Sequence, residues 1–222
     1  MKTFKRISAL LLALILALGM TACGPKEIKG LEGTWHTVLP VTDAVNKGIT
    51  GMGVDISEIE GFDELEISFS IDLELRDGEY TLSLNEKDTQ KSLDAYIASV
   101  KKILTEYLYQ TGADQGLSRE EMDAALIESA GMGAEEYVSS IMDQAAGAID
   151  LGSLVKDGTG FYAADEDRIY FGGSQKTLKE KEIYVEYTLK HRELSLDKAH
   201  GNALDLDSLK TMDVELPLVF TK

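Results

Sequence analysis

Alternation of apolar and polar residues is the clearest pattern in this 222-residue chain. Between 65 and 76, leucine, isoleucine and phenylalanine alternate strictly with serine and charged residues. Asp77 and Gly78 follow, a pair favoured in two-residue hairpin turns because both positions need positive φ. This period of two predicts antiparallel strands with one buried face. Eight segments are predicted as strands: 31–39, 65–76, 80–84, 160–164, 168–172, 182–190, 194–197 and 212–220.

The apolar period changes to 3.6 residues between the third and fourth predicted strands. An apolar stripe runs from Leu93 to Leu108 and predicts an amphipathic helix. Ser118 followed by Glu121 has the spacing of a capping box and predicts the start of a second helix. A third helix is predicted at about 134–148. The sequence therefore predicts a three-helix insertion at about 88–150.

Eight sequential antiparallel strands favour an up-and-down barrel, because closure of the sheet removes its exposed edges. The predicted fold is mainly β with a helical insertion (α+β), and the alternative is an open or two-layer α+β sheet. Gly48, Gly51 and Gly53 lack the spacing of a phosphate-binding loop, so they are predicted to lie in a flexible connection.

The Gly33-Thr34-Trp35 triplet in the first predicted strand resembles the Gly-x-Trp motif of the lipocalin family. The resemblance implies an eight-stranded barrel in which the tryptophan closes one end. It covers the strands but not 88–150. The family also packs an arginine from its last strand across the tryptophan, and here only Lys210 and Lys222 lie near that position in the sequence.

A lipocalin-like barrel implies an interior that holds a small apolar or amphipathic ligand. The inward-facing residues of the predicted strands are the candidates for lining it, and the alternative for them is a filled core. The candidate ligand-binding residues are Trp35, Phe69, Ile71, Leu73, Tyr80, Leu82, Ile183, Val185 and Tyr187.

The N-terminus has the three parts of a secretory signal. A basic start precedes an apolar run at 7–20, too short to span a bilayer comfortably, and the run ends in Met20-Thr21-Ala22-Cys23. These four residues resemble the bacterial lipobox, although the family usually has leucine where Met20 stands. The resemblance implies diacylglyceryl transfer to Cys23, cleavage before it, and a lipid-anchored protein on the extracytoplasmic face of the cell membrane. The alternatives are a cleaved secreted protein and an uncleaved anchor.

This interpretation divides the chain into a signal peptide (1–22), a lipidated tether (23–30) and a single domain (31–222). Cys23 is the only cysteine, so the domain has no disulfide. Cleavage removes three of the 22 Lys and Arg and none of the 39 Asp and Glu, which leaves a net charge of −20. Such an acidic domain is not expected to bind nucleic acid. A fully extended tether reaches at most about 28 Å, which keeps the domain near the membrane.

The sequence offers no recognisable catalytic constellation, metal site or cofactor motif. The three histidines, His36, His191 and His200, lack the spacing of a zinc site. A nucleophile elbow is absent, and the Ser-x-x-Lys matches at Ser99 and Ser195 lack their companion motifs. The sequence therefore predicts a non-enzymatic domain that binds a small apolar or amphipathic ligand. The alternative is an interaction module that docks envelope proteins through its helical insertion.

Overall fold

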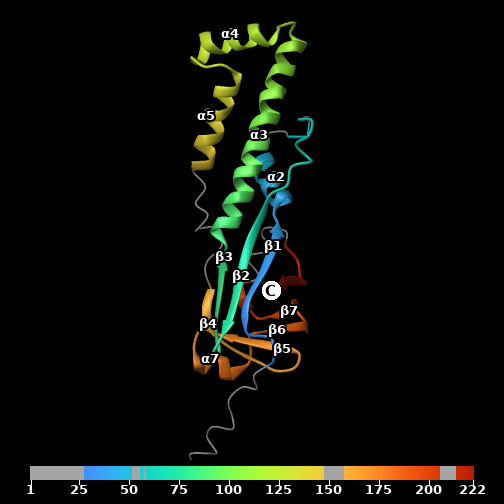
Figure 1. Cartoon of the computed structure of the whole chain (residues 1–222), viewed down its shortest axis with the longest axis vertical. Helices are drawn as coiled ribbons and strands as arrows, with labels where there is room; N and C mark the ends of the chain where they lie inside the picture. Colours follow the sequence, from blue (N-terminus) through green and yellow to red (C-terminus); the bar gives the residue numbers. More distant parts are fainter. Residues whose placement is uncertain (1–27, 52–55, 58, 148–157, 206–213) are drawn as a thin grey trace, which may run out of the picture.

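The computed structural model describes residues 28–51, 56–57, 59–147, 158–205 and 214–222. The predicted signal peptide, Cys23 and most of the tether lie outside these residues. The described part forms a closed barrel of eight antiparallel strands (Figure 1). The strands are β1 (Gly33–Pro40), β2 (Ser68–Arg76), β3 (Glu79–Leu84), β4 (Gly158–Ala164), β5 (Arg168–Gly172), β6 (Tyr184–Lys190), β7 (Glu193–His200) and β8 (Leu218–Thr221).

Each strand pairs with its neighbour in sequence, and β1 pairs with β8 to close the barrel. The period of two places the apolar side of each strand inward. Trp35 lies opposite Leu73, and Leu73 lies opposite Leu82 on the next strand. All three are buried in the hydrophobic core. The predicted closed antiparallel barrel is thus confirmed, and the open-sheet alternative is wrong.

Three helices lie in sequence between β3 and β4: α3 (Glu86–Asp114), α4 (Arg119–Ala130) and α5 (Ala134–Gly147). We refer to α3, α4 and α5 together as the helical arm. The arm projects from one end of the barrel, and α5 returns alongside α3 (Figure 1). The start of α3 packs on the barrel core through Leu93, Tyr96 and Val100. The capping box of Ser118 and Glu121 at the start of α4 is confirmed.

The number of helices differs from the prediction. Helix α2 (Thr42–Gly51) occupies the first connection, so Gly48 and Gly51 lie in a helix and not in a flexible connection. Helix α7 (Gln175–Glu180) joins β5 to β6, and a short 3₁₀ turn spans Ala203–Asp205. Helix α7 lies at the end of the barrel opposite the helical arm (Figure 1). Gly172 allows it to lie close to β5, because an added Cβ would be 2.6 Å from the Leu178 amide nitrogen.

Trp35 lies near the start of β1 and is completely buried. Its indole N–H donates a hydrogen bond of 2.7 Å to the Leu31 carbonyl. The Lys222 ammonium lies 4.1 Å from the centroid of the Trp35 ring. The same ammonium donates to the carbonyl oxygens of Gly30, at 2.7 Å, and Glu32. Lys222 therefore connects the end of β8 to the chain that enters β1.

Candidate functional site

A pocket of about 810 Å³ lies at the end of the barrel opposite the helical arm. We call it the end pocket. Its walls come from the β2–β3 turn, the β4–β5 hairpin and α7, together with Ile28, the first described residue. The lining residues are Ile28, Asp77, Gly78, Tyr162, Ala163, Ala164, Asp165, Glu166, Asp167, Tyr170, Gln175, Leu178, Lys179 and Lys181.

Asp165 braces the β4–β5 turn at the edge of the end pocket. One carboxylate oxygen accepts a hydrogen bond of 3.1 Å from the Arg168 amide, and the other accepts one of 2.8 Å from the Tyr170 hydroxyl. Burial acts to raise the pKa of Asp165, but the hydrogen bonds from Tyr170 and from the turn outweigh it and lower the pKa. Asp165 is therefore held as a carboxylate within the site.

Tyr170 connects this carboxylate to a cation on the other wall. The Lys181 ammonium lies 4.5 Å from the centroid of the Tyr170 ring, within cation–π distance. Lys181 ends α7 in a left-handed conformation with φ of 54°. Burial and the hydrogen bond to Asp165 both raise the pKa of the Tyr170 hydroxyl. A neutral, well-packed tyrosine thus separates a positive group from a negative one.

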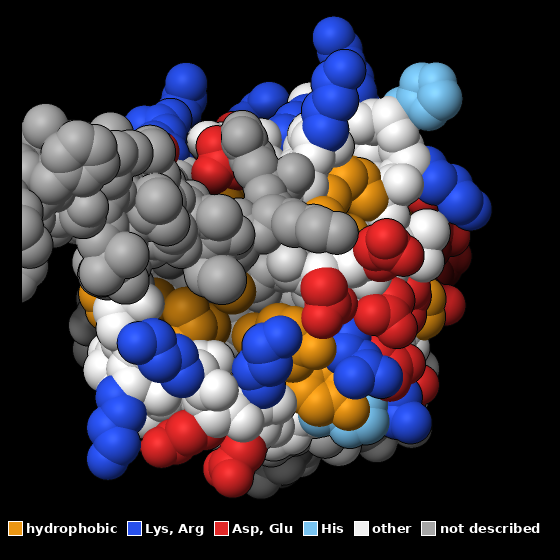
Figure 2. Space-filling model, turned by 90° about the horizontal axis from the view of Figure 1, so that it is seen from below, with side chains coloured by type: hydrophobic (Ala, Val, Ile, Leu, Met, Phe, Trp, Pro, Cys, Tyr) orange, Lys and Arg blue, Asp and Glu red, His pale blue; other side chains and the backbone are white. Residues whose placement is uncertain are grey.

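The floor of the end pocket is apolar and firmly held. Tyr162 and Leu178 are buried, and Ala163 and Ala164 are partly exposed. The Tyr162 hydroxyl donates to a Glu32 carboxylate oxygen at 3.3 Å, and the same oxygen accepts the Asp77 amide. Figure 2 shows this end of the molecule, where hydrophobic side chains lie between basic and acidic ones. The site therefore combines apolar surface with charges of both signs.

The nine residues predicted to bind a ligand occupy a different place. Seven of them are buried members of the barrel core: Trp35, Phe69, Ile71, Leu73, Leu82, Val185 and Tyr187. The other two, Tyr80 and Ile183, are partly buried and pack against that core. None of the nine lines the end pocket. Binding at these nine residues stays a prediction, whereas the end pocket was missed by sequence reasoning.

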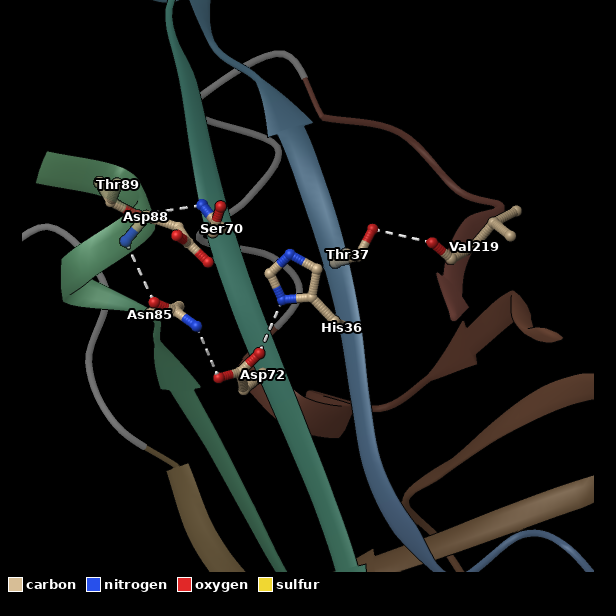
Figure 3. Close-up of polar contacts among 8 residues, drawn as sticks. All are labelled: His36, Thr37, Ser70, Asp72, Asn85, Asp88, Thr89 and Val219. Atoms are coloured by element: carbon tan, nitrogen blue, oxygen red, sulfur yellow. Dashed lines mark hydrogen bonds and ion pairs between the residues drawn. The ribbon is translucent and has the colours of Figure 1, made fainter. Parts of the chain in front are cut away.

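The histidines lie on the outer surface of the barrel. His36 Nδ1 is 2.8 Å from one carboxylate oxygen of Asp72, and Asn85 donates to the other oxygen at 3.1 Å (Figure 3). His200 stacks on Tyr184 with ring centroids 4.3 Å apart, and its Nε2 is 3.1 Å from Glu186. His191 lies in the β6–β7 turn. In the described part of the chain, no three His, Cys, Asp or Glu residues are arranged to hold a metal ion.

The Asp72 contacts join the barrel wall to the helical arm. Asn85 is the N-cap of α3, and its side-chain oxygen accepts the Asp88 amide at 3.1 Å. Thr89, in the first turn of α3, accepts the Ser70 amide of β2 at 3.0 Å (Figure 3). This outer-surface network is thus structural in character, since it holds α3 against β2.

The fold and the end pocket define the molecule as a closed eight-stranded antiparallel barrel that carries a helical arm at one end and a pocket at the other. Comparison with protein-family models, with curated proteins and with solved structures finds no match to this chain. No helix among the described residues has both the length and the apolar composition that crossing a membrane requires.

Proposed function

We propose that this chain is a lipid-anchored extracytoplasmic protein whose barrel binds a small amphipathic ligand in the end pocket. The presence of the end pocket is the main support for the binding function. Its volume of about 810 Å³ lies within the usual range for small-molecule sites. Its apolar floor suits a hydrocarbon portion, and its charged walls suit a polar headgroup. The packed core around Trp35 and Leu73 favours this pocket over the barrel interior as the binding site.

The anchor part of the proposal rests on the sequence from Lys2 to Cys23. Acyl chains on Cys23 contribute about 0.8 kcal/mol for each buried methylene, which holds the domain at the membrane without help from its acidic surface. A Cys23→Ser variant is expected to move from the membrane fraction to the soluble fraction and to lose incorporation of radiolabelled palmitate. Retention of Cys23→Ser in the membrane fraction would contradict the anchor.

We further propose that the barrel is lipocalin-like. Trp35 near the start of β1, covered by a cation from just after β8, supports this assignment. Lys222 takes the place of the arginine that the sequence lacks, because its ammonium both faces the indole ring and donates to carbonyls of the entering chain. The helical arm has no counterpart in that resemblance.

Filling the end pocket tests the binding function. Ala163 lines the pocket from β4, so Ala163→Trp is expected to occupy it. Thr159→Trp, on the same face of β4 but outside the lining, is the matched control. The probe is N-phenyl-1-naphthylamine, a neutral apolar fluorophore. We expect saturable binding to the wild type and to Thr159→Trp, and its loss in Ala163→Trp. No binding to the wild type, or equal binding to both variants, would overturn the proposal.

The helical arm supports a second candidate, an interaction module for an envelope protein. None of the described side chains of α4 is buried, and Ile127 on α4 and Ile141 on α5 are 56% and 47% exposed. An Ile127→Ser, Ile141→Ser double variant is expected to lose crosslinks to envelope proteins in intact cells. Ala125→Ser, an exposed change on α4, is the control and is expected to keep them. Unchanged crosslinking in the double variant would exclude this surface.

A further inference from the structure

We propose that the end pocket selects zwitterionic amphiphiles. In this assignment an apolar chain lies over Tyr162 and Leu178, the anionic part of the headgroup meets Lys179 and Lys181, and the cationic part meets the β4–β5 turn. The inference rests on the proposed binding function and adds the headgroup chemistry of the ligand. It depends on three features of the described residues: the apolar floor, the opposed charges and their rigid spacing.

Tyr170 fixes the spacing between the opposed charges. The Lys181 ammonium lies over the ring, 4.5 Å from its centroid, while the hydroxyl at the far end donates to Asp165 at 2.8 Å. The ring is 6% exposed and therefore has little freedom to move. One rigid side chain thus holds a cation over its ring face and an anion at its hydroxyl end. A ligand with both charges at a short, constant separation complements this arrangement.

The positive wall is available to an anionic group. Lys179 and Lys181 are both exposed, and within the part of the chain that the structure describes neither forms an ion pair with a carboxylate. Lys179 lies in the last turn of α7, whose start is closed by the capping box of Ser174 and Thr177. Phosphate oxygens are strong acceptors for such ammonium donors.

The negative wall offers carboxylates to a cationic group, and one of them, Asp167, also lies 3.9 Å from the Arg168 guanidinium. Glu166 and Asp167 are exposed on the β4–β5 turn, next to the braced Asp165. The Asp165 carboxylate accepts hydrogen bonds from the Tyr170 hydroxyl and from amides of the turn, so it stays ionised and adds its negative charge to this wall. An ammonium or quaternary ammonium group is therefore stabilised on this side.

Charge also argues against ligands of a single sign. The chain carries a formal net charge of −17, which repels an anionic amphiphile at long range. A cationic amphiphile is attracted at long range, but Lys179 and Lys181 repel it inside the pocket. An uncharged headgroup forms no ion pair with either wall. Only a zwitterion satisfies both walls at once.

Calorimetric titration of the mature chain with Cys23→Ser tests this selectivity, because the variant keeps every residue that the structure describes. The probes share a twelve-carbon chain and are used below their micelle concentrations: zwitterionic dodecylphosphocholine, anionic dodecyl phosphate and cationic dodecyltrimethylammonium. Phosphocholine without a chain is the fourth probe. We expect dodecylphosphocholine to bind about tenfold more tightly than the two singly charged amphiphiles, since each gives up one charged contact worth about that factor. It should also bind at least about tenfold more tightly than phosphocholine, which lacks the apolar chain.

Removal of the two lysines tests the positive wall. Lys181→Asn suits the left-handed conformation at that position, and Lys179→Gln is the exposed change on α7. The double variant is expected to bind dodecylphosphocholine about tenfold more weakly. The control variant, Lys87→Gln with Lys91→Gln, removes two exposed lysines from the opposite end of the barrel. Its affinity for dodecylphosphocholine is expected to equal that of the wild type.

The outcomes distinguish a failure of the zwitterion preference from a failure of ligand binding in the end pocket. Equal affinity for the three amphiphiles, together with retained binding of N-phenyl-1-naphthylamine, would overturn the zwitterion assignment and leave the binding function standing. Undiminished affinity of the Lys179→Gln, Lys181→Asn variant for dodecylphosphocholine would also overturn the zwitterion assignment and leave the binding function standing. Phosphocholine binding as tightly as dodecylphosphocholine would show a headgroup site with no role for the chain, which contradicts an amphiphile. Failure of all probes, including the naphthylamine, would overturn both.

Discussion

At the scale of single residues, Lys222 helps to close the barrel. Its ammonium contacts the indole of Trp35 and two carbonyls of the chain before β1, and its amide donates to the Arg192 carbonyl at 3.0 Å. Gly33, with φ of 130°, permits this approach because an added Cβ would lie 2.8 Å from Lys222 Cε. Three segments far apart in the sequence therefore meet at one residue.

We expect Lys222→Ala to lower the free energy of unfolding by about 1–2 kcal/mol, the combined value of a cation–π contact and a charged hydrogen bond. Lys222→Arg keeps the positive charge and the donors, so its stability should stay near that of the wild type. Urea unfolding followed by the fluorescence of Trp35 measures both. Equal losses in the two variants would show that the charge over the ring contributes nothing.

Asp165 gives the β4–β5 turn a pH-dependent contribution to stability. Its pKa is lowered in the folded chain, so the contribution is fully present above the unfolded pKa of about 4 and disappears as the pH falls through the lower, folded pKa. Asp165→Asn should therefore destabilise the protein by about 1 kcal/mol at pH 7 and progressively less as the pH falls below about 4. Urea unfolding at a series of pH values gives this difference directly. A constant difference across the series would contradict it.

At the scale of elements, the attachment of the helical arm depends on the start of α3. Asn85 caps α3 and also donates to Asp72, which in turn contacts His36. We expect Asn85→Ala to cost about 1 kcal/mol and to raise amide hydrogen exchange both in the first turn of α3 and in the neighbouring part of β2.

Ser118→Ala is the matched control for Asn85→Ala. Ser118 caps α4 with the same kind of hydrogen bond, but among the described residues its side chain bonds to Glu121 in the first turn of α4 and not to the barrel. Its loss should therefore raise exchange at the start of α4 alone. If Asn85→Ala likewise affected only its own helix, the contact with Asp72 would have no part in holding the arm to the barrel.

The elements that the sequence predicts well are those with a sustained period. The segment at 65–76 has six alternating apolar positions and α3 has a long apolar stripe, so both elements were predicted, although β2 starts three residues later than expected. Helix α7 is too short to show a period, and its cap uses Thr177 instead of glutamate or glutamine. Helix α2 contains two glycines, which disfavour helix in isolation. Packing on the barrel outweighs that local preference.

The end pocket could not be predicted in the same way. Its residues come from two turns, one short helix and the chain before β1, which approach one another only when the barrel closes. In the sequence, 165–167 resembles an ordinary acidic turn, and nothing connects it to Lys181. The inward positions such as Phe69 and Val185 were correctly predicted to face the interior, but the alternation does not distinguish a filled core from a cavity.

At the scale of the whole molecule, the two candidate surfaces lie at opposite ends. Ile28 lines the end pocket, whereas the helical arm projects from the other end (Figure 1). Ile28 follows Cys23 by five residues, which span at most about 18 Å. An anchor on Cys23 would therefore hold the end pocket close to the bilayer, where amphiphiles are concentrated, and direct α4 away from it.

This orientation can be measured on vesicles, because a lipid on Cys23 would leave an introduced cysteine as the only free thiol. Glu79→Cys places a fluorophore on the exposed β2–β3 hairpin, and Glu128→Cys places one on the exposed side of α4. In the mature lipoprotein reconstituted in phosphatidylcholine vesicles, a quencher attached to the lipid headgroups should quench the label at residue 79 strongly and the label at residue 128 weakly. A soluble quencher should affect both, since both positions are exposed. Equal quenching of the two labels by the lipid-bound quencher would mean that the domain lies along the membrane. Stronger quenching at residue 128 would mean that the helical arm faces the membrane. In either case the end pocket would not be held next to membrane amphiphiles.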